Sequence, residues 1–151
     1  MRDEIPLIRE YQSTDLDDLL GVWEAASAVA HDFLDAKFLQ QERHNITNLY
    51  LPNAETWVWE VGGSVVGFIA LIGNEVGAIF VDPSYHGTGI GRALMDKACT
   101  LREELEVEVF KKNALGRVFY DRYGFELMQE RVHEATGLTV MRLKLAARVQ
   151  S

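Results

Sequence analysis

Glycines at every second position from Gly87 to Gly91 are the clearest chemical signal in the sequence, within the run His86-Gly87-Thr88-Gly89-Ile90-Gly91-Arg92. Such glycines let the backbone turn tightly and expose its N–H groups. A helix is predicted to start at Ile90, and its unpaired N–H groups and positive dipole end would face the same space. This arrangement suits a pyrophosphate, with Arg92 as an additional cation. A tight strand-to-helix turn without a ligand is the alternative interpretation.

Two common phosphate-binding motifs do not match this loop. A Walker loop requires Lys-Ser or Lys-Thr after its last glycine, whereas Gly91 is followed by Arg92 and Ala93. A dinucleotide fingerprint requires G-x-G-x-x-G on the first strand of its fold, whereas the spacing here is G-x-G-x-G and several elements precede it. Glu108 does stand about 20 residues further on, as an NAD-ribose acid would. An NAD-linked enzyme is nevertheless a poor interpretation.

The elements that must position the loop follow from hydrophobic periodicity and turn residues. Helices are predicted from residues 13–18 to about 30, over 35–49 with an end near Pro52, after the glycine loop, and over 113–123. Strands are predicted over residues 5–11, 56–61, 64–72, 75–81, 105–110, 125–133 and 139–145. The strand, helix and strand around the loop imply a right-handed crossover and a parallel pair. We therefore predict an α+β fold with a mixed sheet: antiparallel N-terminal strands, a parallel pair and a closing C-terminal hairpin.

Composition and charge exclude several classes of protein. The chain has 151 residues, 48% hydrophobic and 25% charged, which predicts one domain over 1–151 with an ordered part of about 5–145. The formal net charge of −8 argues against non-specific nucleic-acid binding. The longest strongly apolar stretch, residues 65–72, is too short to cross a membrane. The single cysteine, Cys99, and the absence of Cys/His clusters favour a cytoplasmic protein without a metal site.

Two motifs resemble those of the GCN5-related N-acetyltransferases, called GNAT. The family signature Arg/Gln-x-x-Gly-x-Gly/Ala is matched from His86 to Gly91, with His86 in place of the usual Arg or Gln. The second match begins at Asn113 and ends in Phe119-Tyr120, with Gly116 in place of a frequent Ala. The order of elements agrees from about residue 5 to residue 145. The chain therefore resembles the small bacterial single-domain members of that family.

The resemblance implies acetyl-CoA as co-substrate and no metal. Its pyrophosphate would lie on the glycine loop, and its pantetheine would pair with the extended main chain at residues 79–81 as an added strand. Asn113 is expected to contact the cofactor or only to cap its helix. The expected cofactor-binding residues are Ile79, Phe80, Val81, His86, Gly87, Thr88, Gly89, Ile90, Gly91, Arg92, Asn113 and Phe119.

Acetyl transfer to an amine needs a neutral nucleophile and a proton for the departing thiolate. A lysine-type amine has a pKa of about 10.4, so it needs a general base or a desolvating site. The resemblance indicates Tyr120 as the proton donor, with ring packing as the alternative. Glu75 and His31 are the candidate bases: Glu75 stands where family members often carry a water-relaying carboxylate, and His31 borders the expected acceptor cleft.

The leading hypothesis is direct acetyl transfer to a primary amine in a ternary complex, because no cysteine is placed to carry an acetyl group. The acceptor could be a protein lysine, a protein N-terminus or a small amine. A non-catalytic acyl-CoA-binding or sensor module is the alternative. Exposed sheet edges near the C-terminus are compatible with a homodimer.

Overall fold

Apolar strands joined by short turns build one seven-stranded sheet, which the computed structural model describes within residues 7–146. Its strand order is β1-β2-β3-β4-β5-β7-β6, and β4 with β5 is its one parallel pair within those residues. The strands are β1 (Leu7–Glu10), β2 (Glu55–Val61), β3 (Ser64–Ile72), β4 (Glu75–Val81), β5 (Leu105–Phe110), β6 (Glu126–Val132) and β7 (Thr139–Leu145). The predicted fold class is confirmed; the expected start of the ordered part, near residue 5, lies outside the described residues.

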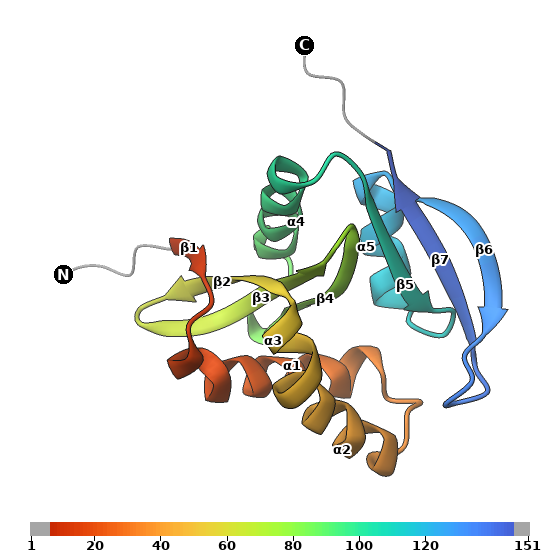
Figure 1. Ribbon diagram of the computed structural model, residues 1–151, viewed down its shortest axis with the longest axis horizontal. Helices are drawn as coiled ribbons and strands as arrows, with labels where there is room; N and C mark the ends of the chain where they lie inside the picture. The colour runs from red at the N-terminus through yellow and green to blue at the C-terminus, as the bar shows by residue number, and fades with distance from the viewer. Residues whose placement is uncertain (1–6, 147–151) are drawn as a thin grey trace.

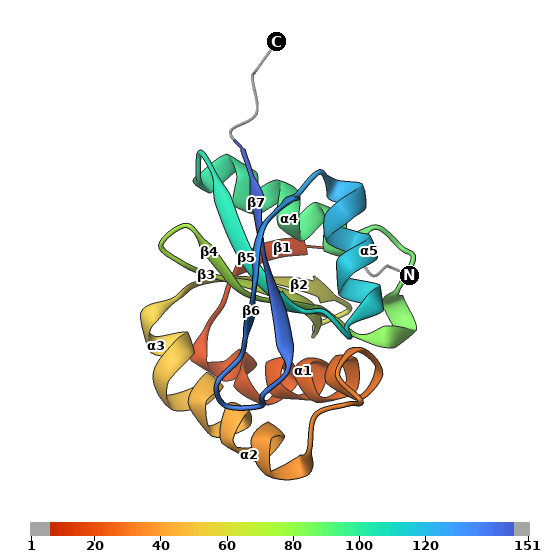
Figure 2. The ribbon, with the colours of Figure 1, turned by 90° about the vertical axis from the view of Figure 1, so that its right-hand side faces the viewer.

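Helices cover both faces of this sheet (Figures 1 and 2). β3 is buried along nearly its whole length, because its side chains meet helices on either side. Phe68 packs in a core with α1, whereas the adjacent Ile69 packs in a core with α4. The helices on the two faces are α1 (Leu16–Ala30) with α2 (Ala36–Asn45), and α4 (Ile90–Leu101) with α5 (Ala114–Tyr123).

The helical segment that precedes β2 is interrupted. After α2 the chain forms a wider π-helical turn, η2 (Ile46–Tyr50), and then the short helix α3 (Leu51–Asn53). The Asp35 carboxylate accepts the Phe38 N–H at 2.8 Å and starts α2. The predicted end of the helical region near Pro52 is confirmed, because α3 ends at Asn53 and Ala54 is already extended.

The parallel pair of β4 and β5 is short, and this opens the sheet. Its register is limited to Glu75 with Glu106 and Val76 with Val107. Beyond these residues β4 continues to pair with β3, and β5 continues to pair with β7. The two strands therefore separate toward their C-terminal ends and leave main-chain groups of β4 without a neighbouring strand on that side.

β6 is the edge strand on the C-terminal side of the sheet, next to β7. Leu127, Met128 and Val132 of this strand are exposed. An exposed apolar edge is compatible with the predicted homodimer, which stays a prediction. Within residues 7–146, no helix has both the length and the apolar character needed to span a bilayer.

Candidate active site

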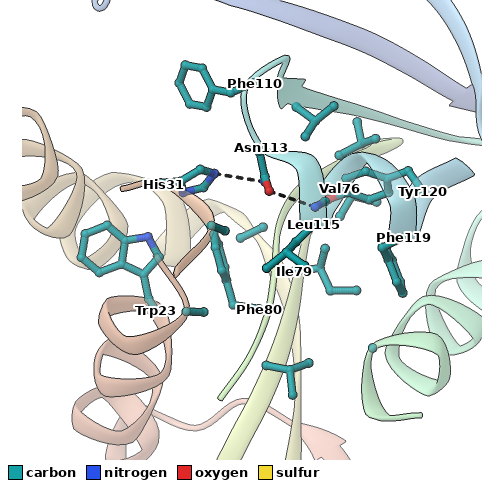
Figure 3. Close-up of a pocket in the computed structure, with 18 of the residues that line it drawn as sticks. Trp23, His31, Val76, Ile79, Phe80, Phe110, Asn113, Leu115, Phe119 and Tyr120 are labelled. Carbon is teal, nitrogen blue, oxygen red and sulfur yellow. Dashed lines mark hydrogen bonds between the residues drawn. The ribbon is translucent and has the colours of Figure 1, made fainter. Parts of the chain in front are cut away.

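A cavity of about 640 Å³ occupies the opening between β4 and β5. The glycine loop and the first turn of α4 form one end of its wall, and α1 and α2 form the other. Figure 3 shows Ile79 and Phe80 of β4 beside it, with His31 on the α1 side and Phe119 and Tyr120 on the α5 side. The cavity therefore joins the predicted phosphate loop to the predicted proton donor and both candidate bases.

The glycine loop has a backbone that side chains would strain. Gly87 has a φ of 79° and Gly89 a φ of 89°, and both values lie in the left-handed region. A Cβ atom added at either position would meet no other atom within 4 Å, so open space lies beside the backbone. Gly91 is different, because a Cβ there would lie 3.2 Å from the Phe119 ring. A bare backbone that leads into the α4 N-terminus is chemically suited to a diphosphate.

All predicted cofactor-binding residues except Thr88 line this cavity. The Thr88 hydroxyl instead donates a hydrogen bond of 2.5 Å to the Tyr85 carbonyl oxygen, which ties the loop to itself. The Thr88 side chain thus stabilises the loop, and its contact with the cofactor stays a prediction.

The two other polar side chains of the loop also have partners within the protein. His86 Nε2 lies 3.0 Å from the Val81 carbonyl oxygen, and because a carbonyl only accepts, Nε2 carries the hydrogen. The histidine thus fastens the loop to the end of β4. The Arg92 guanidinium lies over the Tyr123 ring, 5.4 Å from its centroid, while the residue also lines the cavity.

Asn113 is a buried connector between α5 and α1. Its Oδ1 accepts the Gly116 N–H at 2.9 Å, which caps α5 as the sequence predicts. This bond orients Nδ2 toward His31 Nε2, 3.4 Å away (Figure 3). Since an amide nitrogen only donates, His31 Nε2 accepts this contact. Both ends of the Asn113 amide are therefore used inside the protein.

Gly116 fits closely under the Asn113 side chain, and this explains its departure from the family pattern. A Cβ at Gly116 would lie 2.5 Å from Asn113 Nδ2. We expect Gly116→Ala to displace the cap and to lower the free energy of unfolding by about 1 kcal/mol. Gly21→Ala is the matched control, because a Cβ in that helix would meet nothing within 4 Å. There alanine should raise the free energy of unfolding by up to about 1 kcal/mol. Equal changes in urea unfolding for the two variants would contradict this account.

His31 packs among aromatic rings at the end of α1. Its ring lies edge-on to Phe33, Phe80 and Phe110, with centroid distances of 5.8, 6.1 and 5.6 Å. Burial disfavours the charged imidazolium, so the pKa of His31 is lowered from its ordinary value. A neutral His31 that already accepts from Asn113 at Nε2 is a poor base at that atom.

The lowered pKa of His31 predicts how stability depends on pH. Below about pH 6.5 the unfolded chain takes up a proton at His31 while the folded chain does not. The free energy of unfolding should therefore fall as pH decreases from about 6.5 toward the lower native pKa. We expect the wild type to lose up to about 1.4 kcal/mol per pH unit more than His31→Gln in this range. Urea unfolding at three pH values between about 7.5 and 5.5 measures it; parallel slopes would refute it.

Tyr120 has an environment that favours the protonated hydroxyl. Its side chain is buried, with its ring edge-on to Phe119 and Phe125 at centroid distances of 5.4 Å each. Burial raises the pKa of Tyr120 above its usual value, so the phenol stays protonated at neutral pH. Among residues 7–146 the hydroxyl has no hydrogen-bond partner. The group can therefore serve a ligand in the cavity.

Glu75 lines the cavity but is held by an arginine. Arg142 Nη1 and Nη2 each lie 3.0 Å from one oxygen of its carboxylate. The same guanidinium also binds Glu106 at 2.8 Å. Both carboxylate oxygens of Glu75 are therefore occupied by the guanidinium. The ion pair counts against Glu75 as a general base, and that role stays a prediction.

The far wall of the cavity is not evident from the sequence. Helical periodicity places Trp23 on the inward face of α1, but it cannot distinguish a core position from a cavity wall. Glu42 looks like any polar residue on a surface helix, and His133 is the last residue of a predicted strand. The additional wall residues include Trp23, Phe38, Glu42, Tyr50, Phe110 and His133.

Known proteins are similar to this chain in both sequence and fold. Residues 52–127 match the family model for the acetyltransferase (GNAT) domain. Peptidyl-lysine N-acetyltransferase YiaC of Escherichia coli is 33% identical over 123 residues, which cover 81% of this chain and 84% of YiaC. Peptidyl-lysine N-acetyltransferase YjaB of the same organism is 31% identical over 121 residues, which cover 80% of this chain and 82% of YjaB.

Two solved structures show the same fold. The solution structure of the apo form of YjaB from Escherichia coli has a TM-score of 0.81 at 28% identity, covering 95% of this chain and 99% of YjaB. The PaiA N-acetyltransferase of Thermoplasma acidophilum, solved in complex with coenzyme A, has a TM-score of 0.72 at 19% identity. That match covers 93% of this chain and 99% of PaiA.

Proposed function

Because the chain belongs to the GNAT family of acetyltransferases, we propose that it transfers the acetyl group of acetyl-CoA directly to a lysine side chain of a protein or peptide. Two relatives that align over most of their length are peptidyl-lysine N-acetyltransferases. The observation that carries the proposal is the single cavity that connects the glycine loop, the opening beside β4 and Tyr120. Acetyl-CoA would supply the activated acetyl thioester.

The loop and β4 would bind two different parts of acetyl-CoA, the diphosphate and the pantetheine arm. Backbone N–H groups from Gly87 to Gly91, together with the α4 N-terminus, would bind the diphosphate. The main chain of β4 from Ile79 to Val81 lies beyond the short pairing with β5. A pantetheine arm could therefore pair there in the manner of an added strand. The role of Arg92 would be to add positive charge near the loop while it stacks on Tyr123.

Tyr120 would act as the general acid. As the C–S bond breaks, its Oη would give a proton to the departing thiolate sulfur, and it would be reprotonated by the proton that the attacking nitrogen loses when the amide C–N bond forms. The raised pKa of Tyr120 keeps the phenol protonated at neutral pH before the reaction. In the described residues nothing competes for this hydroxyl. Phe119 and Phe125 hold the ring in place from two sides.

Activation of the amine would rest mainly on desolvation. Of the two candidate bases, Glu75 is bound by Arg142, and His31 accepts from Asn113 at Nε2. A lysine ammonium group that enters the cavity between its aromatic side chains loses its hydrating water. This burial lowers the pKa of the ammonium group. The neutral, nucleophilic form is thereby favoured. Cys99 does not line the cavity, which agrees with direct transfer and not with an acetylated cysteine.

The proposal is tested by acetyl-CoA turnover with a lysine peptide. The purified chain should release coenzyme A thiol only when the peptide is present, and mass spectrometry should find one added acetyl group on its lysine. A peptide with glutamine in place of that lysine, and with a blocked N-terminus, is the control. Thiol release that does not depend on lysine would overturn the proposal. Tight coenzyme A binding without any turnover would favour the sensor alternative.

A further inference from the structure

We propose that Glu42 of α2 recognises a second positive charge on the acceptor, so that the preferred substrate is a lysine with a basic residue nearby. This inference rests on the proposed lysine acetyltransferase function and specifies its substrate class. It starts from the charges on the cavity wall, where Glu42 is the carboxylate that the described residues leave without a cation.

The charged side chains that line the cavity are unevenly distributed. The described wall carries Arg92 and three glutamates, Glu42, Glu75 and Glu108. Arg92 belongs to the cofactor loop, where positive charge suits a diphosphate. The glutamates come from α2, β4 and β5, outside the loop. The wall outside the loop therefore has an acidic character that suits a cationic acceptor.

Two of these glutamates are already neutralised by arginines of β6 and β7. Glu75 is paired with Arg142 at 3.0 Å. Glu108 is paired with Arg131 at 2.5 Å and lies 3.7 Å from Arg142. Neither side chain needs a ligand to balance its charge. Of the three glutamates, Glu42 is therefore the one without a cationic partner among the described residues.

Glu42 is oriented by neutral donors and has no ionic partner among residues 7–146. Its Oε2 accepts from the Tyr50 hydroxyl at 3.3 Å and from Asn45 Nδ2 at 3.4 Å. Its Oε1 has no hydrogen-bond partner within the described part of the chain. The neighbours one turn away on the helix are Phe38, Leu39, Asn45 and Ile46, so no helical ion pair is available to it.

The π-helical turn η2 brings Tyr50 to Glu42. In an ideal α-helix, residues eight positions apart differ by roughly 80° around the axis. A wider turn accommodates an additional residue and reduces that offset, and such turns are frequent at functional sites. Two side chains bond to carbonyls of the preceding turn: Thr47 to Arg43 at 3.3 Å and Asn48 to His44 at 2.9 Å. The irregular helix thus supports the contact between Tyr50 and Glu42 on the cavity wall.

The surroundings of Glu42 make an incoming cation favourable. Trp23, Phe38 and Leu39 line the same cavity and offer apolar surface to the alkyl stem of a lysine or arginine. An acceptor that enters the cavity removes water from Glu42, and an unpaired carboxylate without water is unfavourable. A guanidinium or ammonium on the acceptor would replace that water with a charge-assisted hydrogen bond to Oε1. An acceptor with a neutral neighbour would leave the carboxylate unpaired.

The test compares Glu42→Gln with the wild type on two lysine peptides. The peptides differ in one residue, one or two positions from the lysine, which is arginine in one and glutamine in the other. The wild type should prefer the arginine peptide by about tenfold in kcat/KM, and Glu42→Gln should abolish the preference. The KM for acetyl-CoA should not change. Glu24→Gln is the matched control, because Glu24 is 59% exposed, pairs with Arg43 and does not line the cavity.

Charge reversal strengthens the test. Glu42→Lys should invert the preference, so that a peptide with glutamate beside the lysine becomes the better substrate. Equal kcat/KM for the arginine and glutamine peptides in the active wild type would overturn the inference. An equal loss on both peptides in Glu42→Gln would also overturn it, because it would indicate a general role. If the wild type acetylates no lysine peptide at all, the proposed function itself fails.

Discussion

Replacing Tyr120 with phenylalanine is expected to lower kcat by about 100-fold or more and to leave the KM for acetyl-CoA unchanged. The substitution removes one oxygen from a ring that Phe119 and Phe125 hold in place. The fold should tolerate it, because among the described residues the hydroxyl has no protein partner. The departing thiolate would lose its proton donor, which affects the chemical step and not binding.

A neighbouring tyrosine provides the control for this variant. Tyr123 is also buried and lies on the same helix, but it does not line the cavity. Its hydroxyl donates to Asp96 at 2.5 Å, so Tyr123→Phe should lower stability and leave kcat within about twofold. Steady-state kinetics and thermal unfolding of both variants separate the two roles. Full turnover by Tyr120→Phe would exclude the acid role.

Replacing Gly89 with alanine is expected to raise the Kd for coenzyme A by about tenfold or more. The φ of 89° at this position costs an L-residue about 1–2 kcal/mol, so the loop backbone would shift. The added Cβ would also project into the open space next to the N–H groups proposed to bind the diphosphate. Isothermal titration calorimetry with coenzyme A measures the effect.

Gly63→Ala controls for backbone strain alone. Gly63 lies in the turn between β2 and β3, has a φ of 84°, and would also place a Cβ in open space. Both variants should lose similar stability, but only Gly89→Ala should lose affinity. Equal affinity for coenzyme A in the two variants would show that the loop does not bind the diphosphate. The same conclusion would follow if the wild type did not bind coenzyme A at concentrations up to about 1 mM, because even a weak specific ligand has a Kd of about this value.

Much of the fold could be predicted because it depends on local patterns. The alternation in β5 and the glycine pair between β2 and β3 gave element types and turns directly. The order of strand, helix and strand restricted the crossover to a parallel pair. Asn113 and Gly124 marked both ends of α5, because a cap and a left-handed glycine act within a few residues. The end of the helical region near Pro52 was also predicted, whereas the π-helical turn before it was not.

The candidate site divides in the same way. The glycine loop and the Phe119-Tyr120 pair are visible in the sequence, because each motif is contiguous. The partners of the two candidate bases are not, since Arg142 reaches Glu75 across 67 positions and Asn113 reaches His31 across 82. These contacts weaken the base hypotheses in a way that residue types alone do not show. Glu42 and Tyr50 also become a pair only through an irregular helix.

By itself the sequence determined the order of elements, the phosphate-type loop and the family resemblance, because periodicity, turn chemistry and motif spacing act over short distances. Tertiary structure decided where the sheet opens. The pairing of β4 with β5 ends after Val76 and Val107, while β4 stays paired with β3 and β5 with β7. That separation creates the cavity. Ion pairs between residues far apart in the sequence then determine which glutamates of the cavity wall already have a cationic partner.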